Sequence, residues 1–269
     1  MSIRKITAFI KRDFAMEISY GLIFILRLVK IFAYILTFYL ISSLFGKGAS
    51  AYLTEYGGEY FPFVLIGITF FEYLFVSLHS IPRAIIGEQA LGTLEFILVT
   101  PTKVSTIMIG SNVWEFIFTS FNIFIYLLFS ATFLKVDLSA TNLVSTFIIL
   151  ALTIVSFSSV GVMLAAFILV FKKVDQLVWL IGGIFSFLGG VYYPIKILPK
   201  FLQECAYFLP ITHSLNALRL SFLKGYGFMA LLPDIKFLFI YSCVFFPVSV
   251  VFFKLALKKV KKDGSLLYY

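Results

Sequence analysis

The sequence predicts an all-α integral membrane protein with six membrane-spanning helices. Of its 269 residues, 61% are hydrophobic and only 13% are charged, and phenylalanine alone occurs 34 times. No soluble domain can bury that much apolar surface, so the lipid bilayer has to be the main solvent. The apolar runs are long and uninterrupted, whereas the strands of a membrane barrel alternate apolar and polar residues over about 10 positions. The spans are therefore expected to be helices, which satisfy their own backbone hydrogen bonds.

The first residues, 1–19, predict an amphipathic helix that lies in the membrane interface. Ile3, Ile6, Ile10 and Phe14 fall on one helical stripe, and the basic residues lie mostly off it. No apolar core precedes these charges, so the stretch does not match a cleavable signal peptide. An ordinary cytoplasmic lead-in to the first span is the alternative.

Six apolar runs approach or exceed the length of about 20 residues that a span requires. The third and fourth runs are the longest, so we expect them to tilt or to project beyond the bilayer. The fifth is short and holds Gly182, Gly183, Gly189 and Gly190. Because small residues let backbones approach, we expect this span to pack closely against a neighbour. The predicted spans cover about 22–45, 61–81, 106–134, 143–171, 177–193 and 235–255.

The distribution of lysine and arginine predicts that both termini lie in the cytoplasm. With the N-terminus inside, 15 of the 22 basic residues lie on the cytoplasmic side, counting Arg27 and Lys30, which snorkel inward from the first span. The net charge of +9 is then matched by anionic lipid headgroups, and no nucleic-acid partner is expected. The sequence therefore predicts one multi-pass transmembrane domain, residues 1–269, in the cytoplasmic (inner) membrane.

Between the second and third spans, residues 84–101 predict a short amphipathic helix on the cytoplasmic side. In EQALGTLEFILVTP, from Glu88 to Pro101, the leucines and isoleucine recur at helical spacing, while Glu88 and Glu95 face elsewhere. Pro101 disfavours helix at Thr100, so the helix is expected to end there. One face can rest on the membrane domain and the other is free for a partner. A plain connector between two spans is the alternative.

The segment 191–228 follows the fifth span and is too apolar for a free loop. Pro194, Pro199 and Pro210 nevertheless exclude one continuous helix. Short helices that dip into the outer leaflet or cover a pore mouth fit better, because non-helical backbone at that depth must be buried in protein or line a cavity. His213 in this segment is expected to be an ordinary polar residue on an interfacial helix.

No motif predicts catalysis, a bound cofactor or a metal site in this chain. The only histidines, His79 and His213, have no metal-ligand spacing, and neither a GxSxG elbow nor a GxxxxGK[ST] nucleotide loop is present. Glu72 lies near the middle of the second span, where a carboxylate is costly and tends to be functional. It could pair with Arg27 or Lys30 on the first span, or it could serve proton or ion coupling.

Three motifs together resemble a known family. They are E-x-x-x-G-T-L-E-x-x-L-V-T-P from Glu88, G-x-x-Y-P-x-x-x-L-P from Gly190, and L-P-I-T-H from Leu209. With these motifs in this order among six predicted spans, the chain resembles the membrane (permease) subunit of type-2 ATP-binding-cassette (ABC) exporters. This class exports drugs, antibiotics and lipid-linked polysaccharides. The resemblance covers essentially the whole chain. The chain differs from the family pattern at residues 85–90, where Glu88 is the single charged residue and family members often have several.

The resemblance implies a complex of two six-span permease subunits, as a homo- or heterodimer, with two separate ATPase subunits that bind ATP and Mg. This chain would hold no cofactor itself. The implied function is ATP-driven export of a hydrophobic or amphipathic substrate, such as a drug, a lipid or a lipid-linked glycan. The 84–101 helix would be the coupling helix, contacting the ATPase through Glu88, Gly92, Thr93, Leu94, Glu95 and Pro101. The 191–228 segment would form an external gate of re-entrant helices, with Gly190, Tyr193, Pro194, Pro199, Pro210 and His213.

Two other classes of function stay open on the sequence alone. An ion-coupled secondary transporter would predict internal repeats and paired midplane acids. The sequence has no clear repeat, and Glu72 is its one convincing midplane acid. A membrane-embedded enzyme would need a polar catalytic cluster, and none is visible.

Overall fold

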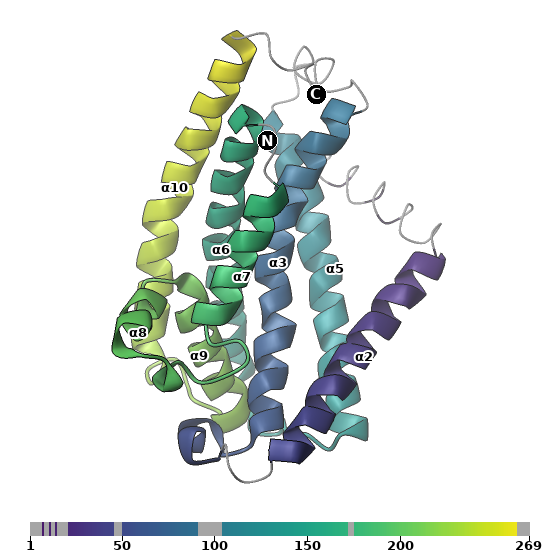
Figure 1. The fold of residues 1–269 in the computed structure, drawn as a ribbon, viewed down its shortest axis with the longest axis vertical. Helices are drawn as coiled ribbons and strands as arrows, with labels where there is room; N and C mark the ends of the chain where they lie inside the picture. The colour runs from purple at the N-terminus through teal and green to yellow at the C-terminus, as the bar shows by residue number, and fades with distance from the viewer. Residues whose placement is uncertain are drawn as a thin grey trace.

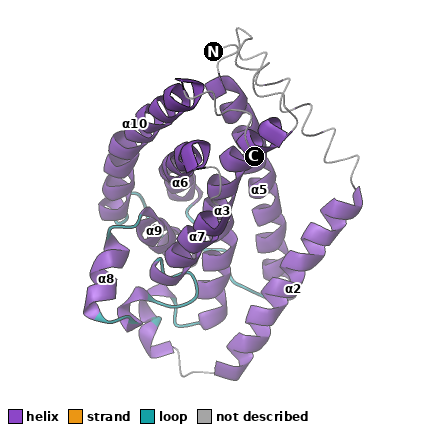
Figure 2. Cartoon of the chain, turned by 45° about the horizontal axis from the view of Figure 1, so that its top comes forward, coloured by secondary structure: helices purple, strands orange, loops and turns teal. Residues whose placement is uncertain are grey.

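Every regular element in the described part of the computed structural model is a helix (Figures 1 and 2). The structure describes residues 7, 11, 14, 21–45, 50–90, 104–171 and 175–262, without the side chains of 23, 24, 27, 28, 31, 45, 50, 81, 84–90, 104–112, 175 and 261. The long helices are α2 (Gly21–Phe45), α3 (Tyr60–Ala90), α5 (Val104–Phe133), α6 (Leu143–Phe171), α7 (Asp175–Leu188) and α10 (Leu232–Lys262). The short ones are η1 (Ser50–Tyr52), η2 (Thr54–Tyr56), η3 (Ile195–Ile197), α8 (Lys200–Tyr207) and α9 (Pro210–Lys224).

Four of the described helices are long and apolar enough to cross a membrane. They contain the stretches Tyr60–Ser80, Val113–Phe133, Leu143–Phe171 and Leu232–Val260. α2 and α7 carry shorter apolar stretches, Phe32–Leu44 and Gln176–Leu188. All six long helices coincide with predicted spans, and the all-helical class is confirmed. The prediction that all six cross the membrane remains a prediction.

The helix ends of α7 and α3 are among those that differ from the prediction. α7 ends at Leu188, five residues before the predicted end of the fifth span. The chain turns there because the Gly189 N–H donates to Phe185 O at 2.8 Å and Gly190 adopts a left-handed φ of +68°. α3 continues past the predicted end of the second span to Ala90, with Pro82 inside it. The first residues of the 84–101 segment therefore belong to the same helix as the second span.

α6 lies at the centre of the bundle, packed against α3, α9 and α10 (Figure 1). Hydroxyl pairs join it to these neighbours: Thr153 to Ser214 of α9 at 2.6 Å, and Ser156 to Ser242 of α10 at 2.9 Å. Such pairs satisfy side-chain donors and acceptors that lipid cannot, so they favour helix–helix contact.

The closest backbone approaches involve Gly67 and Gly161. A Cβ on Gly161 of α6 would collide with the Ser77 carbonyl of α3, and one on Gly67 would collide with Val191 O. Of the four glycines in the predicted fifth span, Gly189 and Gly190 pack closely, because a Cβ on either would collide with Ile211 or Ile195, whereas Gly182 and Gly183 have room for a side chain. A Cβ on Gly183 meets no atom within 4 Å, and one on Gly182 makes only an ordinary contact. Glycine count alone does not show where two backbones meet.

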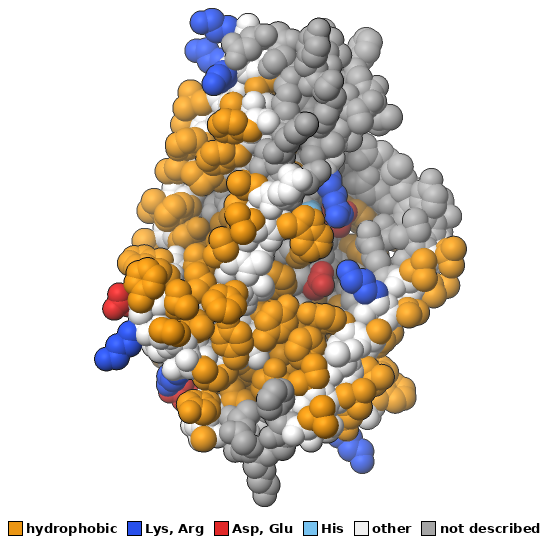
Figure 3. All heavy atoms as spheres, viewed as in Figure 1, with side chains coloured by type: hydrophobic (Ala, Val, Ile, Leu, Met, Phe, Trp, Pro, Cys, Tyr) orange, Lys and Arg blue, Asp and Glu red, His pale blue; other side chains and the backbone are white. Residues whose placement is uncertain are grey.

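The connecting segments 50–59, 134–142 and 189–231 gather at one end of the bundle, which we name the loop end (bottom of Figure 1). The ends of α3 and α10 and the start of α5 lie at the opposite end. Apolar side chains cover most of the face between them (Figure 3). On α10, for example, Phe239, Val251 and Leu255 are more than half exposed. An apolar surface of this extent is stable only against lipid or another protein.

Candidate functional site

The 191–228 segment folds at the loop end as η3, α8 and α9. Each helix begins at one of the predicted prolines: Pro194 and Pro199 occupy the N-cap positions of η3 and α8, and Pro210 lies in the first turn of α9. Proline fits there because its fixed φ suits a helix start and its missing N–H would be unpaired anyway. The prediction of short, proline-separated helices is confirmed. Tyr193 donates a hydrogen bond to Phe187 O of α7 at 2.7 Å and so ties the start of the segment to α7.

A buried arginine fastens this segment to α3. Arg219 of α9 is only 3% exposed, and its Nε and Nη2 donate to Phe63 O at 3.0 Å and Val191 O at 2.9 Å. Its guanidinium also lies 3.5 Å from the centre of the Phe63 ring. Desolvation lowers the pKa of Arg219 to about 9, which leaves the group charged at neutral pH. The Arg219 side chain therefore joins three stretches of the chain, which are α9, the start of α3 and the backbone at Val191. The close approach at Gly67 leaves the space for it.

A second polar group joins α9 to the first turn of α10. His213 Nδ1 lies 2.6 Å from Asp234 Oδ1, and its Nε2 lies 3.0 Å from Tyr207 O. Each ring nitrogen therefore lies within hydrogen-bonding distance of one oxygen acceptor. The other carboxylate oxygen of Asp234 accepts from Asn216 Nδ2 at 2.7 Å. His213 lies on a short helix, as expected, and its contacts link α8, α9 and α10.

The same network reaches the segment between α2 and α3. Tyr56 donates to Asn216 Oδ1 at 2.7 Å, and burial raises the pKa of Tyr56, so its hydroxyl stays protonated. Nearer the surface, Lys196 of η3 pairs with Glu55 of η2. Both partners of that pair are more than half exposed, so it contributes little stability. The buried contacts of Arg219 and the partly buried contacts of Asp234 hold the 191–228 segment in place.

Four residues of this network were not predicted to belong to a site: Tyr56, Asn216, Arg219 and Asp234. Asn216 does stand three residues after His213 and three before Arg219, a spacing that places neighbours on one helix face. That spacing was the one available signal. Asp234 and Tyr56 reach the network from other parts of the chain, and no sequence pattern links them to it.

We expect His213 and Asp234 to be energetically coupled. The variants His213→Ala and Asp234→Ala should each lower the melting temperature in detergent, and the double variant should lose less than the sum, with a coupling energy of about 1–3 kcal/mol. The physical reason is that either single change leaves a buried polar partner without its hydrogen bond. The matched control pairs Asp234→Ala with Glu204→Ala, an exposed residue of α8, and should be additive. Additive losses for the His213 pair would contradict this expectation.

A cavity of about 230 Å³ lies between α2, α3, α5, α7 and the 191–228 segment. Lys30 and Glu72 both line it, and Figure 3 shows acidic and basic side chains together at mid-height of an otherwise apolar face. The structure thus brings two of the predicted intramembrane polar residues to one cavity; the side chain of Arg27 is outside the described part. The hydroxyls of Tyr34 and Tyr192 meet at 3.1 Å beside it. Its aromatic lining residues are Tyr34, Phe71, Phe75, Tyr126, Trp179 and Tyr192.

The predicted coupling residues lie almost wholly outside the described part of the chain. Glu88 belongs to α3, but its side chain is not described. The structure does not describe residues 91–103, which include Gly92, Thr93, Leu94, Glu95 and Pro101. Most of the predicted 1–19 helix also lies outside the described residues. Among the described residues, no group of three or more His, Cys, Asp and Glu side chains could hold a metal ion.

Comparison with known proteins gives two findings. The family model described as "ABC-2 type transporter" matches residues 5–223. The chain is also similar to the inner membrane transport permease YadH of Escherichia coli strain K12 and of Shigella flexneri. Each of these alignments is 23% identical over 171 residues and covers 62% of this chain and 65% of the relative. The alignment thus spans just under two thirds of the length of these curated relatives.

Proposed function

The chain belongs to the ABC-2 type transporter family, and on that premise we propose that it is the permease subunit of an ATP-driven exporter. The observation that carries the proposal is the extent of the family match, which runs from residue 5 to residue 223 and takes in both the 84–101 and most of the 191–228 segments. In this proposal two permease subunits form the conduit. Separate ATPase subunits bind ATP and Mg on the cytoplasmic side, which is the side of the α3 and α10 ends. The membrane is the cytoplasmic (inner) one, with both termini in the cytoplasm.

The 191–228 segment is proposed to be the external gate. Its attachment supports this role, because one set of contacts joins it to α3 and another joins it to α10, so one can release while the other holds when those helices move. Packed helices and interfaces shift between discrete arrangements as rigid units, so such a segment can open without unfolding. In this proposal Arg219 remains the pivot, and the His213–Asp234 contact is the one that releases.

The proposed substrate is hydrophobic or amphipathic. The aromatic rings around the cavity of about 230 Å³ support this, since ligand sites combine apolar walls with a few convergent polar groups. Lys30 and Glu72 supply those groups. The same pair is also the observation on which an ion-coupled transporter would rest. The two candidates differ in energy source, so transport into inside-out vesicles should require ATP and survive an ionophore if the exporter proposal is right.

Affinity purification from native membranes in mild detergent tests the assembly. We expect a protein carrying GxxxxGK[ST] to co-purify in roughly equal amount, because the nucleotide loop absent from this chain has to be supplied by a partner. If the chain is recovered alone, and stays alone after cross-linking in the membrane, the proposed function is wrong.

Charge reversal in the coupling segment should weaken that complex. We expect Glu95→Arg to lower recovery of the ATPase partner about tenfold while membrane insertion is unchanged, because a carboxylate that faces a basic partner becomes a repulsive cation. The control is Glu204→Arg, which reverses an exposed charge on α8 at the loop end. Equal recovery with Glu95→Arg and the parent chain would argue against 84–101 as the docking element.

A further inference from the structure

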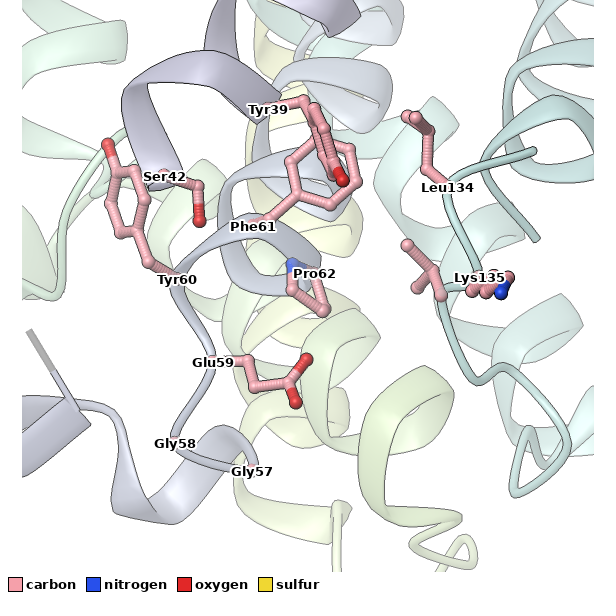
Figure 4. A pocket seen from close by; sticks show the side chains of 11 residues that line it. Tyr39, Ser42, Gly57, Gly58, Glu59, Tyr60, Phe61, Pro62, Leu134 and Lys135 are labelled. Atoms are coloured by element: carbon pink, nitrogen blue, oxygen red, sulfur yellow. The ribbon is translucent and has the colours of Figure 1, made fainter. Parts of the chain in front are cut away.

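The loop end holds a second, larger cavity that the proposed transport path does not use. It has a volume of about 500 Å³ and is enclosed by the end of α2, the start of α3 and the chain after α5 (Figure 4). Tyr39, Phe61 and Pro62 form an apolar wall, with the Tyr39 and Phe61 rings in an edge-to-face contact at 5.2 Å. A cavity of this size is in the range that accommodates small ligands.

Two exposed residues of opposite charge, from different elements, are among those that line this cavity (Figure 4). Glu59 precedes α3 and Lys135 follows α5, and both line the cavity. Within the described part of the chain, neither side chain has a hydrogen bond or an ion pair. The two groups are therefore available to a ligand. A ligand with one positive and one negative group complements both, whereas a singly charged ligand faces a like charge on one side.

Lys135 has an unusual backbone conformation. Its φ of +54° is left-handed and unusual for a residue other than glycine, and Lys135 is the one such residue among those described. The conformation ends α5, because the Leu134 and Val136 N–H groups both donate to Ser130 O, at 3.2 and 3.1 Å. Glycine is the usual residue at such a helix end. A lysine in this conformation is less stable than a glycine would be, but it adds an ammonium group to the lining of the cavity.

The surface beside the cavity is apolar and exposed. Leu40 and Leu44 flank the lining residues of α2 and are 56% and 85% exposed, and Phe133, next to the lining residue Leu134, is 73% exposed. These side chains lie near the ends of helices predicted to span the membrane. A charged pocket that opens onto an apolar strip at that level matches a lipid, with its headgroup in the pocket and its acyl chains on the strip.

We propose that this cavity binds the headgroup of a phosphatidylethanolamine molecule from the leaflet at the loop end. The headgroup ammonium donates hydrogen bonds to the Glu59 carboxylate, and its phosphate accepts from Lys135. The acyl chains lie along Leu40, Leu44 and Phe133. Phosphatidylcholine has a cation without N–H donors, and phosphatidylglycerol has no cation, so both are disfavoured. The site does not depend on the transport cycle, and its test is independent of the proposed function.

Native mass spectrometry of the purified full chain tests this with an equimolar mixture of phosphatidylethanolamine, phosphatidylcholine and phosphatidylglycerol. We expect about tenfold more bound phosphatidylethanolamine than either other lipid, which is the effect of one charge-assisted hydrogen bond. Glu59→Gln should abolish that preference. Lys135→Gly should lower binding of all three lipids about tenfold, because every one of them carries the phosphate. Glycine suits the left-handed φ, so this variant keeps the fold.

The matched controls are Glu204→Gln and Lys200→Gln, exposed charges on α8 that do not line the cavity, and neither should change lipid binding. Equal binding of the three lipids by the parent chain would overturn the proposal. So would a preference that survives Glu59→Gln, or one that is lost equally in Glu204→Gln. Soluble phosphoethanolamine separates the two sources of this headgroup: displacement of the lipid at equimolar concentration would mean a soluble ligand and would contradict the lipid site.

Discussion

Arg219→Leu is expected to detach the 191–228 segment from α3 and to stop transport. The variant leaves Phe63 O and Val191 O without their donors in a site where Arg219 itself is only 3% exposed. Stranding two buried acceptors should lower the free energy of unfolding by about 3 kcal/mol. Loss of the guanidinium from the face of the Phe63 ring adds to this. The measurement is thermal unfolding in detergent, with limited proteolysis of the 191–228 segment at lower temperature.

Two further variants separate the effect of geometry from that of charge. Arg219→Lys keeps the positive charge, but a lysine ammonium lacks the planar guanidinium that reaches both carbonyls. This variant should therefore recover only part of the lost free energy of unfolding. Lys224→Leu removes an exposed cation from the same helix and should leave the melting temperature and the cleavage rate unchanged. If Arg219→Leu unfolds like the parent chain and is cut no faster, the guanidinium does not fasten this segment.

Gly161→Ala should strongly destabilise the bundle. A Cβ there would collide with the Ser77 carbonyl oxygen and lie 2.8 Å from the carbonyl carbon, and backbone atoms cannot rotate away as a side chain can. α3 and α6 have to separate, at a cost of about 2–3 kcal/mol for overpacking. Alanine would otherwise favour the helix by about 1 kcal/mol, so the expected loss opposes the intrinsic propensity.

Gly183→Ala is the matched control for this prediction. Gly183 also lies inside an apolar helix, but no atom comes within 4 Å of a Cβ there. We expect the melting temperature to stay the same or to rise, because only the helix-propensity gain remains. Equal losses for Gly161→Ala and Gly183→Ala would show that glycine matters in these helices for a reason other than the contact with Ser77.

No other part of this chain packs against Gly183, so a role for this glycine would have to involve a second subunit. If the Gly183→Ala permease is as stable as the parent but assembles or transports poorly, α7 meets its close neighbour in the proposed dimer. The close packing that is missing at Gly183 within one chain would then exist between chains.

What the sequence determined by itself are the features set by short-range patterns. Uninterrupted apolar runs predicted the positions of α2, α3, α5, α6, α7 and α10, because a span depends only on length and composition. Pro194, Pro199 and Pro210 predicted breaks in the 191–228 segment, because proline excludes helix interiors by its own covalent structure. The GTLE motif and its companions predicted the family to which the chain belongs.

Only the tertiary structure decided which distant residues meet. Arg219 counts in the sequence as one more basic residue near the membrane, yet its partners are carbonyls of Phe63 and Val191, which have no sequence signature. His213 was expected to be an ordinary polar residue until Asp234 was found beside it. Gly161 rather than Gly183 makes the close helix contact, because the rotation of each helix about its axis is set by all of its neighbours together. Spans follow from local composition, and contacts between them follow from packing that no local pattern encodes.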